Sequence, residues 1–216
     1  MKHRDTIIRL LFLALFAFLM ARGNMMLWLG LFGISLLAAV LFGRFYCGYV
    51  CPMNTVMIPV DWVAKKLKLQ TLKTPQWLEK GYVTWIALVG SVAAMVLFKR
   101  FLGIRLPVLL IWLAAAVLVT LRYRPAVFHN LICPFSAPQK LFGRFARQSR
   151  MVEESACIGC KRCEKACPSD AITVAPEDQK AHIHVALCHQ CTNCRQVCPK
   201  DAIGYSRVLP KEKSAV

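Results

Sequence analysis

Four apolar stretches stand out in the first part of the chain, covering residues 10–21, 25–42, 82–98 and 106–121. Each is about 12 to 18 residues long, near or below the lower limit for an α-helix that spans a bilayer. Basic residues mark several of their ends, and Pro107 lies where the first turn of the fourth helix tolerates a proline. This pattern predicts a membrane domain of four transmembrane helices.

The first apolar stretch has two interpretations. A basic amino-terminal segment precedes a short apolar core, as in a secretory signal peptide. However, no small-x-small cleavage site follows it, and Arg22-Gly23-Asn24 leads straight into the second stretch. We therefore expect a helical hairpin that the mature protein retains.

Composition supports a division of the chain into two parts. Hydrophobic residues make up 57% of the 216 residues, yet Lys and Arg number 28, so the two kinds of residue must occupy different segments. We predict a four-helix transmembrane domain at residues 1–139, a basic interfacial linker at 140–152, and an α+β ferredoxin-like domain with two clusters at 153–216.

Basic residues in the short loops predict the orientation in the membrane. One side would carry Arg44, Lys65, Lys66, Lys68, Lys73, Lys80, Arg122, Arg124, Lys140, Arg144, Arg147 and Arg150. The other would carry Arg22, Lys99, Arg100 and Arg105. This asymmetry puts both termini in the cytoplasm, across a bacterial or archaeal inner membrane. The net charge of +17 is then a signal of topology and of anionic lipid, and nucleic acid is not an expected partner because the basic residues flank hydrophobic helices.

Eight of the eleven cysteines form two copies of the pattern C-x2-C-x2-C-x3-C-P, which is the bacterial-type [4Fe–4S] run. In such runs the first three cysteines hold one cluster and the fourth reaches the other cluster. The predicted ligands of the first cluster are Cys157, Cys160, Cys163 and Cys198. Those of the second cluster are Cys188, Cys191, Cys194 and Cys167.

Two other interpretations of these cysteines, zinc sites and disulfides, fit the pattern less well. Zinc sites use four ligands each and leave the third position and the trailing Cys-Pro of each run unexplained. Disulfides need an oxidising compartment, which the predicted topology does not provide. The pattern therefore favours iron–sulfur chemistry, with electrons handled one at a time.

The three remaining cysteines lie at the predicted cytoplasmic edge of the membrane domain. Cys47 and Cys51 belong to a Cys-x3-Cys-Pro element after the second apolar stretch. Cys133 ends a similar element after the fourth stretch, in which His129 occupies the place of the first cysteine.

This arrangement resembles the NapH family of membrane iron–sulfur quinol dehydrogenase subunits. The most specific parts of the resemblance are residues 47–54 and the ferredoxin repeat. It implies a conduit that passes electrons between membrane quinol and a redox partner enzyme or electron-carrier subunit. Related architectures also occur in assembly proteins, so the fold alone does not decide the function.

His129 departs from the family pattern, which has a cysteine at this place. Imidazole can bind cluster iron, and a neutral ligand in place of a thiolate raises the reduction potential. We therefore hypothesise a third iron–sulfur cluster held by Cys47, Cys51, Cys133 and His129. The alternatives are a cluster with three protein ligands, in which His129 is an ordinary interfacial residue, or buried inert thiols.

A quinol would need a site at the membrane interface. Residues 53–69 predict a bent, partly interfacial amphipathic helix interrupted at Pro59, and this segment carries Asp61. Asp61 could accept a quinol proton, or it could simply pair with Lys65 one turn later. The four apolar stretches contain no histidine, so no haem is expected within the bilayer.

The chain has no Rossmann fingerprint, P-loop or nucleophile constellation. Two functions from different classes follow. The first is a quinol-linked electron-transfer subunit that works with a partner enzyme. The second is a maturation factor or metal reductase that delivers electrons to a metallocofactor, and a purely structural anchor is a third possibility.

Overall fold

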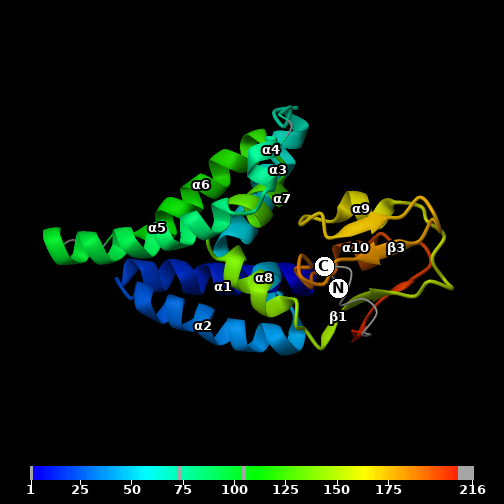
Figure 1. The fold of residues 1–216 in the computed structure, drawn as a ribbon, viewed down its shortest axis with the longest axis horizontal. Helices are drawn as coiled ribbons and strands as arrows, with labels where there is room; N and C mark the ends of the chain where they lie inside the picture. Colours follow the sequence, from blue (N-terminus) through cyan, green and yellow to red (C-terminus); the bar gives the residue numbers. More distant parts are fainter. Residues whose placement is uncertain (1, 73, 104–105, 209–216) are drawn as a thin grey trace.

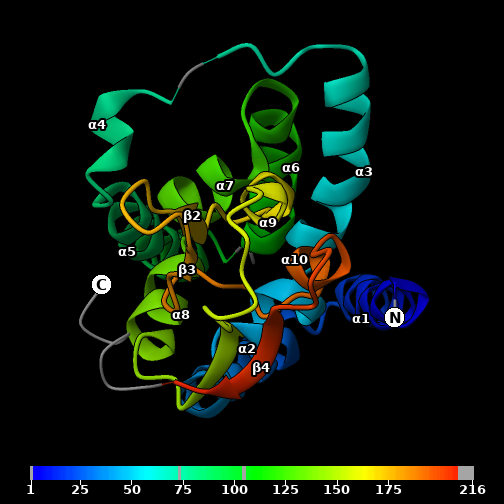
Figure 2. The same cartoon turned by 90° about the vertical axis from the view of Figure 1, so that its right-hand side faces the viewer.

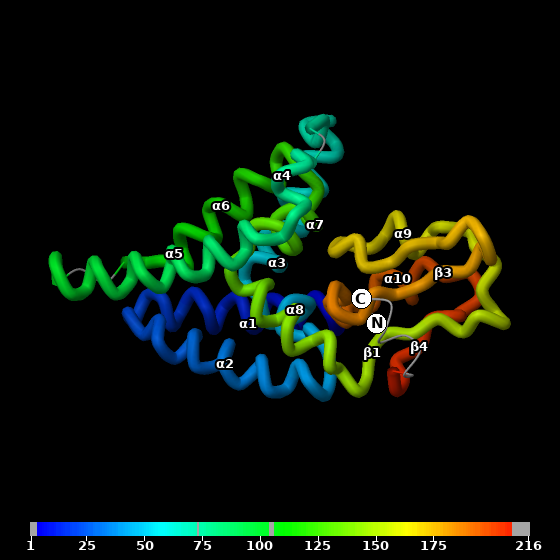
Figure 3. Tube along the Cα trace, viewed as in Figure 1, coloured from blue at the N-terminus to red at the C-terminus, as the bar shows by residue number. Residues whose placement is uncertain are grey.

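The computed structural model describes residues 2–72, 74–103 and 106–208. Lys73, Arg105 and residues 209–216 of the predicted ferredoxin domain lie outside the described residues. A helical half forms an elongated bundle, and a smaller module with short strands caps one of its ends (Figure 1). The start of the described chain (blue) and its described carboxy-terminal end (red) both lie at the capped end, as the trace shows (Figure 3).

The four predicted apolar stretches all form helices. They correspond to α1 (Lys2–Ala21), α2 (Met25–Phe42), α5 (Val83–Leu97) and α6 (Val108–Arg122). The helices α1 and α2 form the expected hairpin, whose turn places Gly23 in a left-handed conformation with φ 70°. Phe16 and Trp28 pack edge to face across this hairpin, with ring centroids 5.1 Å apart.

Two of these helices are long and apolar enough to cross a membrane: α2 and the continuous segment Val83–Leu102, in which α5 runs into the π-turn η2 (Phe98–Leu102). The amino-terminal half of α1 carries Arg4, Asp5 and Arg9, and α6 has only 15 described residues. The expectation of four spans therefore stays a prediction.

The predicted interfacial helix is α3 (Pro52–Lys66), which contains Pro59 without ending there. It packs along α6 through a face that includes Met53 and Met57, while Trp62 on its other side is exposed. Short helices α4 (Gln76–Glu79), α7 (Pro125–Val127) and α8 (Ser136–Gly143) complete the helical half. Gln139 on α8 donates a hydrogen bond to Ser35 on α2 at 2.8 Å.

The capping module contains two small antiparallel sheets. Strand β1 (Gln148–Val152) pairs with β4 (Ile203–Arg207), and β2 (Ile172–Val174) pairs with β3 (Ala181–Ile183). Helices α9 (Arg162–Ala166) and α10 (Asn193–Gln196) lie side by side over the helical half (Figure 2). Asp170 and Asp201 occupy equivalent places after the two Cys-Pro pairs, with φ of 47° and 48°, so the sequence repeat is also a repeat of conformation.

The predicted linker at residues 140–152 needs correction. Its first residues complete α8, and residues 148–152 form strand β1 of the capping module. Between them, the backbone N–H of Arg147 donates to the carbonyl of Val40 at 3.1 Å. The segment is therefore structured at both ends: it completes a helix, and its last five residues pair with strand β4, far along the chain.

Candidate metal centres

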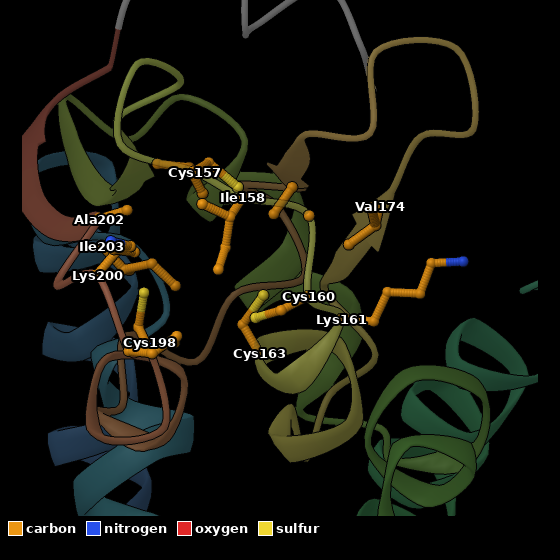
Figure 4. Close-up of a pocket in the computed structure, with 14 residues that line it drawn as sticks. Cys157, Ile158, Cys160, Lys161, Cys163, Val174, Cys198, Lys200, Ala202 and Ile203 are labelled. Carbon is orange, nitrogen blue, oxygen red and sulfur yellow. The ribbon is translucent and has the colours of Figure 1, made fainter.

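Four predicted ligands meet in one cavity of the capping module. Cys157, Cys160, Cys163 and Cys198 line it, with their sulfur atoms turned toward its centre (Figure 4). Cys198 comes from the second cysteine run and the others from the first, which is the crossover that the spacing predicts. We call this set the outer site.

The other four ferredoxin cysteines, Cys188, Cys191, Cys194 and Cys167, form the inner site. All four are buried. Burial, and next the charges of Cys191 and Cys167, raise the pKa of the Cys194 thiol to about 12. Iron must displace such protons when it binds.

Backbone amides point at two sulfurs of the inner site. The N–H of Gln190 donates to Cys188 Sγ at 3.4 Å, and the N–H of Ala171 donates to Cys167 Sγ at 3.3 Å. Such bonds stabilise thiolate charge. The inner site is thus enclosed, and backbone N–H groups donate hydrogen bonds to two of its sulfur atoms. The outer site is open, since Cys160 is exposed and Cys157 and Cys198 are partly exposed.

The two membrane-edge elements share one backbone geometry. The π-turns η1 (Tyr46–Val50) and η3 (Phe128–Ile132) each end at an extended cysteine followed by a proline. The N–H of Cys51 donates to the Tyr46 carbonyl, and that of Cys133 donates to the Phe128 carbonyl, both at 2.8 Å. Since π-turns are rare and concentrate at functional sites, this repetition marks the two elements as a pair.

Cys47, Cys51, Cys133 and His129, which we call the membrane-edge site, are all buried. Burial, and then the charges of Cys47 and Cys133, raise the pKa of Cys51. Burial likewise raises the pKa of Cys133 to about 12, with Cys47 the next cause. The three sulfur atoms thus lie close to one another.

His129 is held as a neutral imidazole. Burial, followed by the charge of Arg44, lowers its pKa to about 3. Its Nε2–H donates to Asn54 Oδ1 at 3.1 Å, which leaves the Nδ1 lone pair free to bind a metal. Histidine ligands are commonly oriented in this way by an acceptor at the other ring nitrogen.

The membrane-edge site abuts the inner site directly. A Cβ atom added at Gly48 would overlap the backbone carbonyl oxygen of His189, which lies between Cys188 and Cys191. Tyr49 donates from its hydroxyl to the carbonyl of Gln190 at 3.4 Å. On the other side, Asn130 donates to the carbonyl of Ser169, two residues after Cys167, at 2.6 Å.

None of the eleven cysteines forms a disulfide. Within the described ranges, no three His, Cys, Asp or Glu side chains converge as they would around a single metal ion. A cluster spreads its protein ligands over several irons. The donor sets described above, cysteine with one imidazole, are of the kind that iron–sulfur clusters use.

Comparison with known proteins agrees with this chemistry. A family described as "4Fe-4S binding domain" matches residues 24–70 and again 105–151, so each match contains one membrane-edge element. A family described as "4Fe-4S dicluster domain" matches residues 156–202. Among relatives, the chain is 27% identical to the ferredoxin-type protein NapH of Haemophilus influenzae, over 66% of this chain and 54% of that protein.

The chain is similar to NapH-type ferredoxin proteins. It is also 29% identical to the methylamine utilization ferredoxin-type protein MauN of Methylobacillus flagellatus, over 74% of this chain and 62% of that protein. An uncharacterised protein of Methanocaldococcus jannaschii is 29% identical, over 62% and 55%. The chain thus spans little more than half the length of these curated relatives, and no solved structure matches it.

The chain thus carries 4Fe–4S binding domains of the ferredoxin type, like the NapH and MauN proteins. One buried residue that sequence reasoning treated only as a topology signal supports that chemistry. Arg44 is fully buried, and it donates to the carbonyls of Ala186 at 3.2 Å and Leu187 at 3.3 Å. Its other terminal nitrogen lies 3.7 Å from Cys47 Sγ.

No carboxylate among the described residues pairs with Arg44. A buried charge is costly unless an opposite charge or several donors and acceptors compensate it. Cys47 is the one candidate ligand that contacts this cation, so thiolate charge at the membrane-edge site is the natural partner of Arg44.

Sequence reasoning also missed His189, because a Cys-x2-Cys pattern sets no requirement on the residues between its two cysteines. Its ring packs edge to face on His129, with centroids 4.7 Å apart. Asn54 was noted only as part of a motif. The sequence signals for these residues are a histidine between two ligands and an amide two residues after Cys-Pro, and both carry meaning only once the two halves are docked.

Asp61 forms the ion pair with Lys65 that the simpler of its two interpretations expects. Its carboxylate accepts hydrogen bonds from Lys65 at 2.7 Å and from Gln70 at 2.8 Å. It lines a cavity that Asn54 also lines, between α3, the segment around Pro125 and the loop around Pro168. The structure therefore brings Asp61 near the membrane-edge site through Asn54, but as a carboxylate that is already paired.

Proposed function

We propose that this protein is a membrane-anchored electron conduit between quinol and a redox partner enzyme or carrier. The outer and inner sites would each hold a [4Fe–4S] cluster. Cys47, Cys51 and Cys133, with His129, would hold a third cluster. An iron–sulfur cluster, once bound, accepts or releases one electron at a time.

The observation that carries this proposal is the order of the three ligand sets. The membrane-edge site contacts the inner site through Gly48 and His189, and the inner site shares its cysteine runs with the outer site. The ligands also become more exposed in that order, from buried Cys51 to exposed Cys160. The ligands at the membrane end are therefore shielded from water, and those at the other end are accessible to a soluble partner.

Exposed apolar side chains on the helices support a place in the membrane. Contiguous apolar surface of this kind is uncommon on soluble monomers. Examples with half or more of their area exposed are Leu11, Phe18, Met26, Ile34, Leu37, Ile86, Val89 and Leu118. We infer a cytoplasmic membrane of a bacterium or archaeon, with both termini and the capping module on the cytoplasmic side.

Quinol oxidation would take place in the cavity lined by Asn54 and Asp61. Exposed apolar residues of α3, Ile58 and Trp62, lie beside it and give a path from lipid. Asn54 connects the cavity to His129 by the bond at 3.1 Å. The chain would thus position a quinol headgroup next to the membrane-edge site.

Quinol reactivity is the direct test. Full-length protein, purified without oxygen in detergent, is expected to lose visible absorption when a short-chain menaquinol or ubiquinol is added, because electrons enter the bound clusters. A matched titration with Cu²⁺ serves as the comparison. Indifference to both quinols combined with rapid oxidation of the dithionite-reduced protein by Cu²⁺ would contradict the proposal and favour a metal reductase.

Asn54 and Asp61 are expected to differ in their importance. Asn54→Leu removes the acceptor that orients His129, and loss of such a partner costs about 10- to 100-fold in metal affinity or activity. Asp61→Asn removes an exposed pair with Lys65, worth about 1 kcal/mol at most. Quinol-dependent reduction should therefore fall at least about tenfold in the first variant and stay near that of the wild type in the second. An equal loss of quinol-dependent reduction in both variants would instead indicate that Asp61 accepts the quinol proton.

A further inference from the structure

His189 is a buried titratable side chain that the proposed function does not use. Its exposed fraction is 1%, and neither ring nitrogen has a hydrogen-bond partner among the described residues. Buried polar groups in proteins nearly always have a partner, and each exception needs an explanation. His129, which is equally buried, has Asn54 as its partner.

The ring of His189 packs edge to face against His129 and makes no hydrogen bond among the described residues. The backbone carbonyl oxygen of His189 lies against Gly48. The imidazole of His189 is thus held against the membrane-edge site with both ring nitrogens unpartnered.

The position of His189 in the chain sets it apart from the other candidate ligands there. Cys47, Cys51, Cys133 and His129 all come from the helical half, whereas His189 comes from the capping module, between inner-site residues Cys188 and Cys191. The backbone contact with Gly48 fixes this loop against η1 and so directs the ring toward His129 at a centroid distance of 4.7 Å and an interplanar angle of 82°.

We propose that His189 is a second imidazole ligand of iron at the membrane-edge site, supplied by the capping module. This inference rests on the proposed third cluster. The three cysteines would each bind one iron of a cubane, and the two imidazoles would share the fourth, as two imidazoles share one iron of the [2Fe–2S] Rieske centres, where they raise the reduction potential. The site would then be completed only when the two halves of the protein are docked.

Pulsed EPR on the full-length protein, labelled with ¹⁵N-histidine and prepared anaerobically, tests the assignment. The wild type is expected to show two inequivalent histidine nitrogen couplings. His189→Ala should remove one and His129→Ala the other. His182→Ala, which changes an exposed histidine on β3, is the matched control and should retain both.

A further variant separates ligation from folding. His189→Cys offers a thiolate in place of the imidazole, so it should keep the iron content of the wild type, lose one nitrogen coupling and lower the midpoint potential of one cluster. If neither His189 variant folds, the wild-type spectrum alone decides, since two couplings support the inference and one or none overturns it.

The outcomes also distinguish this inference from the third cluster itself. A wild type with about twelve irons and a single nitrogen coupling that His129→Ala abolishes would overturn ligation by His189 and leave the third cluster standing. A folded His189→Ala variant that keeps two couplings would do the same. A wild type with only about eight irons and no nitrogen coupling would remove the third cluster and this inference together.

Discussion

Gly48→Ala is expected to loosen the capping module from the helical half. The added Cβ would overlap the backbone carbonyl oxygen of His189, and neither backbone can move aside as a flexible side chain could. Gly48 does not have a positive φ, so the clash alone opposes the substitution. Overpacking of this kind typically costs about 1–3 kcal/mol. Because the contact joins the membrane-edge and inner sites, its loss should also slow quinol-dependent reduction of the ferredoxin clusters.

Hydrogen exchange measures this effect directly. Peptides covering residues 184–192 should exchange faster in Gly48→Ala than in the wild type. Gly90→Ala is the matched control, because Gly90 lies within α5 with nothing within 4 Å of an added Cβ. A helix interior gains about 1 kcal/mol or less from this change, so the control should exchange like the wild type. Identical exchange in the two variants would show that the two halves do not pack through Gly48.

Cys51→Ser is expected to remove one cluster and leave two. The substitution takes away a thiolate from the membrane-edge site, and a cubane lost there lowers the iron content by about four atoms per chain. The outer and inner sites share no ligand with this site, so their EPR signals should persist. Iron and acid-labile sulfide, determined on anaerobic protein, give the count.

Cys160→Ser provides the comparison, since it makes the same chemical change at the outer site. It should also lower the iron content, but it should remove a ferredoxin-type signal and leave the membrane-edge signal intact. Full iron content in Cys51→Ser, together with a loss in Cys160→Ser, would contradict a cluster at the membrane edge. Identical spectra in the two variants would mean that the three sites do not assemble independently.

Much of the ferredoxin module could be predicted from spacing, because short-range geometry controls it. Three cysteines within seven residues must share one site, and the trailing Cys-Pro is held away from them by a short helix. The apolar stretches predicted helices for a similar reason. The number of membrane spans is harder to predict. Helix α1 is charged in its first half and α6 is short, so the hydrophobic pattern alone does not decide whether these two helices cross a membrane.

The docking of the two halves could not be predicted. The two cysteine runs have the same spacing, so nothing local distinguishes the run that faces the helices. The choice depends on complementary details far apart in the chain, such as Arg44 with the carbonyls of Ala186 and Leu187. Strand β1 was misassigned to a linker for the same reason, because its partner β4 begins only at Ile203.

The cysteines differ in their exposure, so they should differ in their sensitivity to dioxygen. Sulfur ligands oxidise according to their accessibility, and beyond the sulfenic stage the damage is generally permanent. Cys160 stands at the surface, whereas Cys47, Cys51 and Cys133 are sealed within the fold. Dioxygen should therefore damage the outer site first. In protein prepared in air, the membrane-edge site should survive longest.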